Sequence, residues 1–182
     1  MKRFILIAAL VAAPAFAAEF EGVTSPDTVT VDGKTLQLNG MGLRQKFVFK
    51  VYVASLYVEH ASKNPADIIK ADEVRRVELK MLRDLEKKAV VDAIKEGFEK
   101  NAGAAGLAPL QERLNKFTEK ITDVKKGASL VIQYVPGKGT VVDGGKDTYV
   151  AEGKDFADAL FNVWLGAKPV DDNLKKGMLG NK

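Results

Sequence analysis

The residues with the most distinctive chemistry stand at one end of a long apolar segment. Arg44 follows Gly42 and Leu43, and the segment after it, residues 47–58, is filled mostly by Val, Phe and Tyr. This composition predicts a β-strand that is covered on both faces. A guanidinium at the entrance to such an environment needs an anionic or hydrogen-bonding partner, because a buried unpaired charge is costly. That partner is either a carboxylate of the protein or a ligand.

Arg44 has the right chemistry to recognise an anion. Its planar guanidinium can hold a carboxylate or an enolate through two parallel hydrogen bonds, and Tyr52 and Tyr57 could each add a phenolic donor. If residues 42–58 form one continuous strand, Tyr52 lies an even number of residues from Arg44 and shares its face, whereas Tyr57 reaches that face only across a bulge. The alternative stays open at this point: a strand-end ion pair for Arg44 and two ordinary core tyrosines.

Most other reactive chemistry is missing from the sequence. There is no cysteine and only one histidine, His60, which supports neither a zinc site of the usual kind nor a serine-histidine-acid triad. The pairs Gly40-x-Gly42 and Gly137-x-Gly139 lack the pattern of a dinucleotide-binding loop, and we interpret both as turns. We therefore expect no metal and no organic cofactor.

The first 17 residues are typical of a secretory signal peptide. Lys2 and Arg3 supply the positive end, residues 4–13 the apolar segment, and Ala15-Phe16-Ala17 the small-x-small cleavage site. The apolar segment is shorter than the roughly 20 residues that cross a bilayer. We expect a cleaved signal and an exported chain, residues 18–182, without a stable membrane anchor. Export without cysteines fits a bacterial periplasm.

The exported part has the size and charge of a single ordinary domain. Removing Lys2 and Arg3 takes the formal net charge from +4 to +2, and no nucleic-acid-binding motif accompanies this small surplus, so we exclude nucleic acid as a partner. About 165 residues without a repeat or a Pro/Gly/Ser-rich linker indicate one domain.

The order of the predicted elements indicates an α+β fold. Apolar residues alternate where we predict strands and recur at helical spacing where we predict helices. Strands, then helices, then strands and a closing helix favour a largely antiparallel sheet with helices on one face. The predicted elements are a hairpin over 28–39 turning at Asp32-Gly33, a strand over 42–58, a helix opening at Asn64-Pro65, a strand over 76–82, helices over 85–98 and 107–121 separated by 103–109, three strands between 128 and 151 broken at 136–137 and 144–145, a helix capped by Asp155 and ended by Gly166, and a last helix over about 171–178.

Two segments make the chain resemble the chalcone isomerase superfamily, specifically its bacterial, exported chalcone isomerase-like branch. One runs from Gly40 to Arg44 and leads into residues 50–57. The other is residues 156–166, followed by Pro169 and the tail 174–180. The resemblance spans the mature chain. It implies an open-faced β-sandwich, in which a large antiparallel sheet packs against a layer of helices, with a ligand cleft between the two layers.

The resemblance also implies a site. The superfamily includes plant enzymes that close a chalcone into a flavanone and non-catalytic relatives that bind fatty acids; in both, an arginine matched by Arg44 meets the negative oxygen of the ligand. Tyr52 falls where the enzymes carry a threonine, and Val163 and Trp164 where they carry polar or thioether cleft residues. The tyrosine and asparagine of the enzymes' helix have no counterpart in residues 84–97. Donors of this kind are worth on the order of a few kcal/mol each, so we do not expect a fast cyclase.

We therefore expect a non-catalytic binder of a fatty acid or a similar amphipathic carboxylate. The expected ligand-binding residues are Arg44, Tyr52, Tyr57, Val163 and Trp164. The first alternative is an isomerase, or intramolecular lyase, that acts on a phenolic or enone substrate and uses Arg44 to stabilise an oxyanion. The second is an assembly partner in the cell envelope, in which Arg44 forms only an ion pair. No particular protein partner is indicated.

Overall fold

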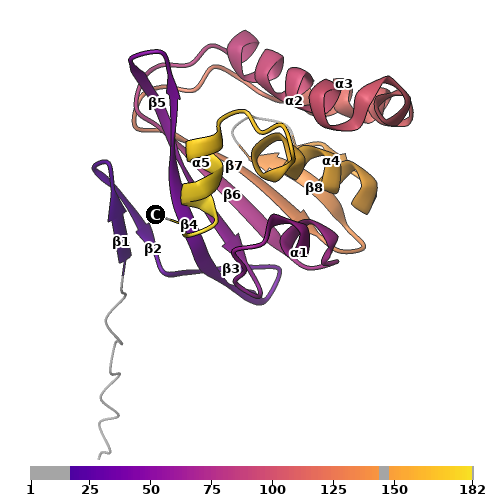
Figure 1. The fold of residues 1–182 in the computed structure, drawn as a ribbon. Coiled ribbons are helices and arrows are strands. Elements are labelled where there is room, and N and C mark those ends of the chain that lie inside the picture. Colours follow the sequence, from indigo (N-terminus) through magenta and orange to yellow (C-terminus); the bar gives the residue numbers. More distant parts are fainter. Residues whose placement is uncertain (1–16, 144–147, 182) are drawn as a thin grey trace, which may run out of the picture.

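An antiparallel sheet forms the framework of the molecule (Figure 1). The computed structural model describes residues 17–143 and 148–181, and within them seven strands pair in the order in which they follow along the chain. A separate two-stranded hairpin precedes the sheet. The strands are β1 (Ala17–Phe20) and β2 (Val23–Pro26) in that hairpin, and β3 (Thr28–Val31), β4 (Lys34–Lys46), β5 (Phe49–Val58), β6 (Arg75–Met81), β7 (Ser129–Val135), β8 (Gly139–Asp143) and β9 (Val150–Ala151) in the sheet.

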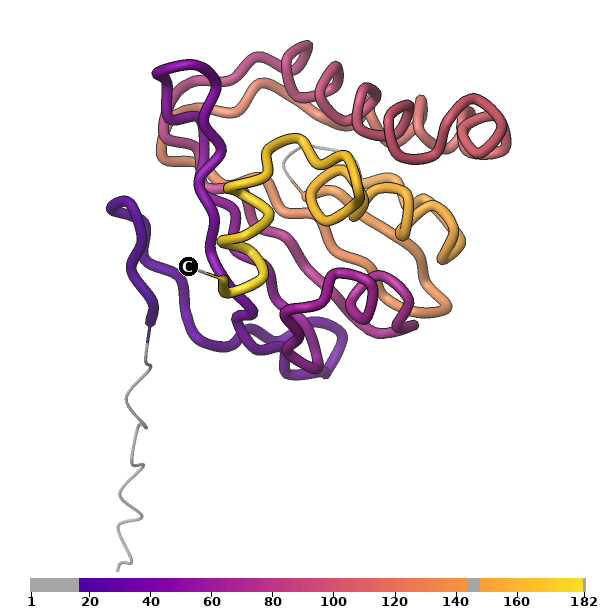
Figure 2. Tube along the Cα trace, in the orientation of Figure 1, coloured from indigo at the N-terminus to yellow at the C-terminus, as the bar shows by residue number. Residues whose placement is uncertain are grey.

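The helices lie over one face of this sheet, as the trace in Figure 2 shows, and share one apolar core with it. Leu56, Leu79 and Leu130 from the sheet pack in the same cluster as Phe98 and Leu160 from the helices. The predicted α+β class, with a large antiparallel sheet packed against helices, is confirmed. The helices are α1 (Pro65–Lys70), α2 (Lys87–Leu107), α3 (Gln111–Glu119), α4 (Lys154–Leu165) and α5 (Asp172–Met178), with the short 3₁₀ helix η1 (Ala108–Leu110) before α3.

The predicted single strand over residues 42–58 is wrong. This stretch contains the end of β4, a two-residue turn at Phe47 and Val48, and β5, which returns antiparallel to β4. Hairpin turns favour Gly, Asn or Asp, because those residues adopt positive φ at little cost. Here Phe47 adopts a φ of +55° instead, so the sequence carries no conventional turn signal at this point.

Gly40 and Gly42 lie inside β4 and not in turns, which corrects that interpretation. A Cβ atom at Gly42 would collide with the backbone of Leu174, and one at Gly40 with the backbone of Gly177. Helix α5 therefore lies directly on β4, at a distance that only residues without side chains permit. This contact holds the N-terminus of α5 beside Arg44.

Several boundaries differ in smaller ways. The predicted break between the two long helices is a single non-helical residue, Gly103, within α2, followed by η1. Gly153 and not Asp155 precedes α4 as its N-cap, and Asp155 forms an ion pair with Arg113 instead. The hairpin at Asp32-Gly33, the helix at Asn64-Pro65, the strand at 76–82 and the last helix are confirmed within one or two residues.

Two sequence interpretations fall wholly or mostly outside the described residues. The proposed signal peptide covers residues 1–16, together with Ala17, which is the first residue of β1. The predicted turn at Gly144-Gly145 also lies outside them. None of the helices in the described part of the chain has the length and apolar character that spanning a membrane requires.

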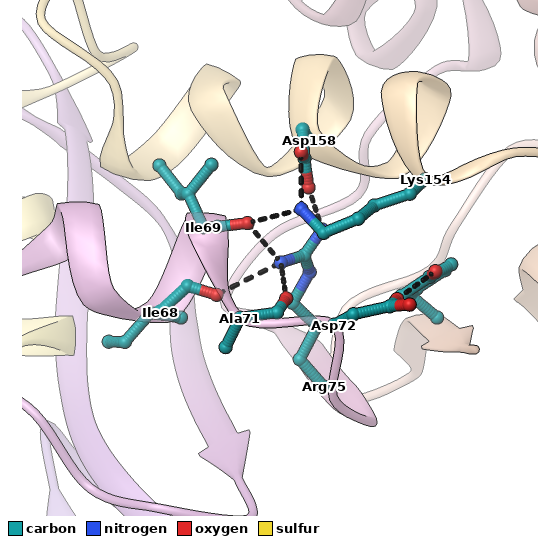
Figure 3. A network of polar contacts seen from close by, with 8 residues as sticks. Ile68, Ile69, Ala71, Asp72, Arg75, Lys154 and Asp158 are labelled. Atoms are coloured by element: carbon teal, nitrogen blue, oxygen red, sulfur yellow. Dashed lines mark hydrogen bonds and ion pairs between the residues drawn. The ribbon is translucent and has the colours of Figure 1, made fainter.

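A buried arginine ties α1 and α4 to the sheet (Figure 3). Arg75 of β6 donates from Nη1 to the carbonyls of Ile68 and Ile69, each at 2.9 Å, and pairs through Nη2 with Asp158 of α4. Its guanidinium also lies 4.7 Å from the ring centroid of Phe161. Removing a partner from such a buried charge is strongly destabilising, because it leaves the charge uncompensated. The network fixes α4, the helix that carries Val163 and Trp164.

Candidate functional site

A pocket opens between the β4–β5 hairpin, β6 and helices α2 and α4. Its volume is about 420 Å³, within the range of about 300–1,000 Å³ that is usual for small-molecule sites. Most of its wall is apolar, and its polar side chains gather at the hairpin and at the start of α2. The apolar wall includes Val51, Leu79, Met81, Ala89, Val90, Ala93, Ile94, Val163 and Val170, and the polar groups belong to Arg44, Lys46, Tyr52, Arg83, Asp84, Glu86 and Trp164.

Arg44 stands at the junction of this pocket and α5. Its Nη1 donates to the carbonyl of Gln45 at 2.7 Å and to Oδ2 of Asp171 at 3.1 Å. Asp171 is the N-cap of α5 and also accepts from the backbone N–H groups of Asn173 and Leu174. Within the described chain, Nε and Nη2 of Arg44 have no hydrogen-bond acceptor. The guanidinium is thus positioned through one nitrogen while its other donors stay available.

Tyr52 is the direct cross-strand neighbour of Arg44. The two side chains share a face because opposite residues of paired strands do so, not because of even spacing along one strand. The Tyr52 hydroxyl accepts a hydrogen bond from Nε1 of Trp164 at 3.2 Å, and its own proton has no acceptor among the described residues. Burial raises the pKa of Tyr52 to about 12, and the Trp164 bond and the charge of Arg44 offset only part of this rise. Near neutral pH, Tyr52 is therefore a buried, protonated donor.

Helix α4 brings Val163 and Trp164 to the same pocket. A Cβ atom at Gly97 of α2 would stand 2.8 Å from the γ-methyl groups of Val163, so Gly97 allows the two helices to approach closely. The carbonyl of Val163 accepts from the N–H of Val170 at 2.8 Å, which holds the segment leading to α5 against α4. Both side chains are almost fully buried.

The structure brings four of the five predicted site residues together and separates the fifth. Tyr57 points to the opposite face of the sheet, where it packs with Val31, Leu36 and Val74. The bulges in the β4–β5 pairing do not bring it to the pocket side. Burial raises the pKa of Tyr57 as well. The prediction that Tyr57 lies beside Arg44 is therefore wrong.

Sequence reasoning missed several residues of the pocket. Asp171 was expected only at the start of a short helix, and its contact with Arg44 spans more than 120 positions of the chain. Lys46, Phe47 and Phe49 were assigned to a buried strand, and Arg83 was not considered as a site residue. The apolar stripe of α2 did signal a buried face, but not that part of the face lines a pocket.

The chain belongs to the chalcone isomerase-like family, whose model matches residues 17–180. A search of curated proteins finds no match. Among solved structures, the chain is similar to a fatty-acid binding protein of Arabidopsis thaliana, with a TM-score of 0.68, 15% sequence identity, and coverage of 90% of this chain and 96% of the other. At this identity the likeness shows a shared fold.

Proposed function

We propose that this protein binds a fatty acid or a similar amphipathic carboxylate in the pocket beside Arg44. The observation that carries the proposal is a set of donors without acceptors in the wall of a mostly apolar pocket. They are Nε and Nη2 of Arg44 and the hydroxyl proton of Tyr52, none of which has an acceptor in the described chain. A hydrogen bond to a charged group is worth about 1.5–3 kcal/mol, and a ligand carboxylate would supply acceptor oxygens for these donors.

The apolar wall suits the rest of such a ligand. Burying a methylene group is worth about 0.8 kcal/mol, so a ten-carbon tail supplies roughly 8 kcal/mol before the cost of association. On this estimate the tail provides most of the affinity. Arg44 and Tyr52 then set the orientation of the ligand and its preference for a negative head group.

The comparison supports the same class of ligand. The similar Arabidopsis thaliana structure is that of a fatty-acid binding protein, and it covers nearly the whole of both chains. A pocket closed by packed side chains would have favoured the envelope-assembly alternative, whereas about 420 Å³ is open beside Arg44.

The isomerase alternative rests on the same two donors. Arg44 and Tyr52 could both stabilise an oxyanion, but α2 lines the pocket with Ala89, Val90, Ala93 and Ile94, which move no proton. The pKa of about 12 also makes Tyr52 a poor base near neutral pH. Incubation with naringenin chalcone, followed by absorbance, decides this alternative: turnover above the spontaneous rate that disappears in Arg44→Gln would favour an enzyme.

We expect the binder to act in the periplasm, because the N-terminal segment has the three parts of a cleavable signal. Fractionation of the producing cells, with the mass of the mature chain, tests this point. A periplasmic product that starts near Ala18 agrees with it. A cytoplasmic product that retains residues 1–17 contradicts it.

Binding itself is tested with two probes of equal chain length. Lipid extraction and mass spectrometry identify what co-purifies, and the delipidated protein is then titrated with laurate and with dodecanol, which lacks the charge. We expect saturable binding of both probes and tighter binding of laurate. If nothing co-purifies and neither probe binds, the proposal is wrong.

A further inference from the structure

The turn of the β4–β5 hairpin exposes a group of large apolar side chains. Phe47, Val48 and Phe49 are 86%, 80% and 56% exposed, the highest values among the exposed large apolar residues of the described chain. The hairpin reaches away from the sheet at the end where α2 begins (Figure 1). Folding does not require these residues, since a two-residue turn with positive φ at its first position is formed best by glycine followed by a polar residue. The backbone of Phe47 is strained in this conformation.

Three cations lie beside this apolar tip, and the carboxylates of Asp84 and Glu86 line the same pocket. Lys46 and Lys50 flank the turn, and Arg83 lies over the ring of Phe49 at 4.9 Å from its centroid. Lys50 is paired with Glu21, whereas Lys46 and Arg83 have no carboxylate within ion-pair distance in the described residues. Exposed aromatic and aliphatic side chains ringed by lysine and arginine are the chemistry that anionic membrane interfaces attract.

The tip also forms part of the pocket wall. Lys46, Phe47, Phe49 and Arg83 line the same pocket as Arg44 and Tyr52. A surface that contacts the tip therefore lies next to the pocket opening. A ligand that passes between that surface and the pocket would cross little water.

We propose that the β4–β5 tip docks the protein on an anionic lipid bilayer, with Phe47, Val48 and Phe49 inserted at the interface and Lys46 and Arg83 facing the lipid head groups. Charge complementarity selects this partner. A protein partner would need a surface that is both apolar and acidic, whereas an anionic bilayer offers both properties everywhere. Docking goes beyond the proposed function and does not depend on which ligand the pocket holds.

The test is flotation of the purified mature chain, residues 18–182, with vesicles of phosphatidylethanolamine and phosphatidylglycerol, compared with vesicles of phosphatidylcholine alone. We expect binding to the anionic vesicles that weakens as salt is added, because added salt screens the charges. Lys46→Glu should lower the affinity by about fivefold or more.

The decisive variant is Phe47→Gly/Val48→Ser, which gives the turn the residues that its φ angles favour. It should fold at least as well as the wild type, as thermal unfolding will show, and lose vesicle affinity by at least about tenfold. Val150→Ser is the matched control, since Val150 is an exposed valine on β9, an edge strand that does not pair with β4 or β5. It should bind as the wild type does.

Two results would overturn docking. One is equal flotation of the wild type and the double turn variant, or no flotation of either. The other is concentration-dependent self-association, seen by sedimentation and abolished in the double variant, without vesicle binding, which would make the tip a contact between copies of the chain. A failed laurate titration together with successful flotation would reject the proposed ligand and leave docking intact.

Discussion

Neighbouring groups position the side chains of Arg44 and Tyr52 and leave some of their hydrogen-bond donors without acceptors. Asp171 and the carbonyl of Gln45 fix one nitrogen of Arg44, and Trp164 donates to the oxygen of Tyr52 and leaves its proton free. A ligand oxygen that accepts from these donors forms hydrogen bonds that the protein itself does not supply. Positioning by neighbours and availability to a ligand are therefore combined in the same two side chains.

Removing the Tyr52 hydroxyl should weaken binding and leave Trp164 without its acceptor. We expect Tyr52→Phe to lower laurate affinity roughly tenfold to a hundredfold, the worth of a hydrogen bond to a charged group. Its free energy of unfolding should fall by about 1–3 kcal/mol. Calorimetric titration and urea unfolding measure both effects. Tyr57→Phe, on the other face of the sheet, should leave the affinity unchanged; equal losses in both variants would contradict the assigned roles.

The raised pKa of Tyr52 predicts a loss of stability in alkali. The folded-state pKa of Tyr52, about 12, lies above the ordinary value of 10.0. The contribution of the protonated Tyr52 to the free energy of unfolding is therefore full below pH 10 and is lost as pH rises through 12. In that window it falls by about 1.4 kcal/mol per pH unit. Urea unfolding across the window should therefore show a steeper decline for the wild type than for Tyr52→Phe. Parallel declines would mean that the phenol is not shielded from water.

Asp171 competes electrostatically with a ligand carboxylate for Arg44. Asp171→Asn removes that charge and keeps a side chain that can cap α5. We expect laurate affinity to rise by about fivefold, as the loss of one nearby like charge at a solvated site suggests. Asp155→Asn, which breaks a pair with Arg113 outside the pocket, is the control and should not change the affinity. An unchanged affinity in Asp171→Asn would contradict this competition between the two carboxylates.

At the scale of the element, the contact of α5 with β4 shapes the polar end of the site. Gly42 lets the backbone of Leu174 lie directly on the strand, and this approach carries the helix N-cap to Arg44. Helix α4 is held in a comparable way, through Gly97 on one side and the Arg75 network on the other. The pocket is therefore fixed by element packing as much as by its own side chains.

A side chain added between α5 and β4 should alter the site, although the added atoms do not contact the pocket. Gly42→Ala places a methyl group against the backbone of Leu174, which has no rotamer that could move aside. We expect a loss of about 1–3 kcal/mol in stability, together with weaker laurate binding as Asp171 and Arg44 shift. Thermal unfolding and calorimetry measure the two effects. Stability equal to that of the wild type would contradict the close packing.

The limits of sequence reasoning also lie at this scale. Hydrophobic alternation and helical spacing located most elements, because burial of one face produces a regular pattern. The β4–β5 hairpin was missed because Phe47 and Val48 occupy a turn without turn residues. The sequence placed Arg44 and Tyr52 on one face because of their even spacing along a single strand. They do share a face, but because they are opposite each other on two paired strands. The partnership of Arg44 with Asp171 could not be predicted, because no local pattern encodes a contact between distant segments.

At the scale of the whole molecule, one sheet and its helices enclose a pocket that ends in donors and opens beside an apolar, basic tip. The chain belongs to the chalcone isomerase-like family and shares its fold with a fatty-acid binding protein of Arabidopsis thaliana. A protein that binds an amphipathic ligand needs an apolar interior, fixed polar groups and access to a lipid source. The pocket, the Arg44–Tyr52 pair and the β4–β5 tip correspond to these three needs.

The central claim, that Arg44 receives the head group of a carboxylate, is tested most directly by titrating Arg44→Gln with laurate and dodecanol. Arg113→Gln serves as the control, because Arg113 is paired with a carboxylate outside the pocket. We predict that Arg44→Gln loses roughly tenfold to a hundredfold in laurate affinity and keeps its dodecanol affinity, while Arg113→Gln matches the wild type for both. Equal laurate affinity in the wild type and Arg44→Gln would contradict the claim.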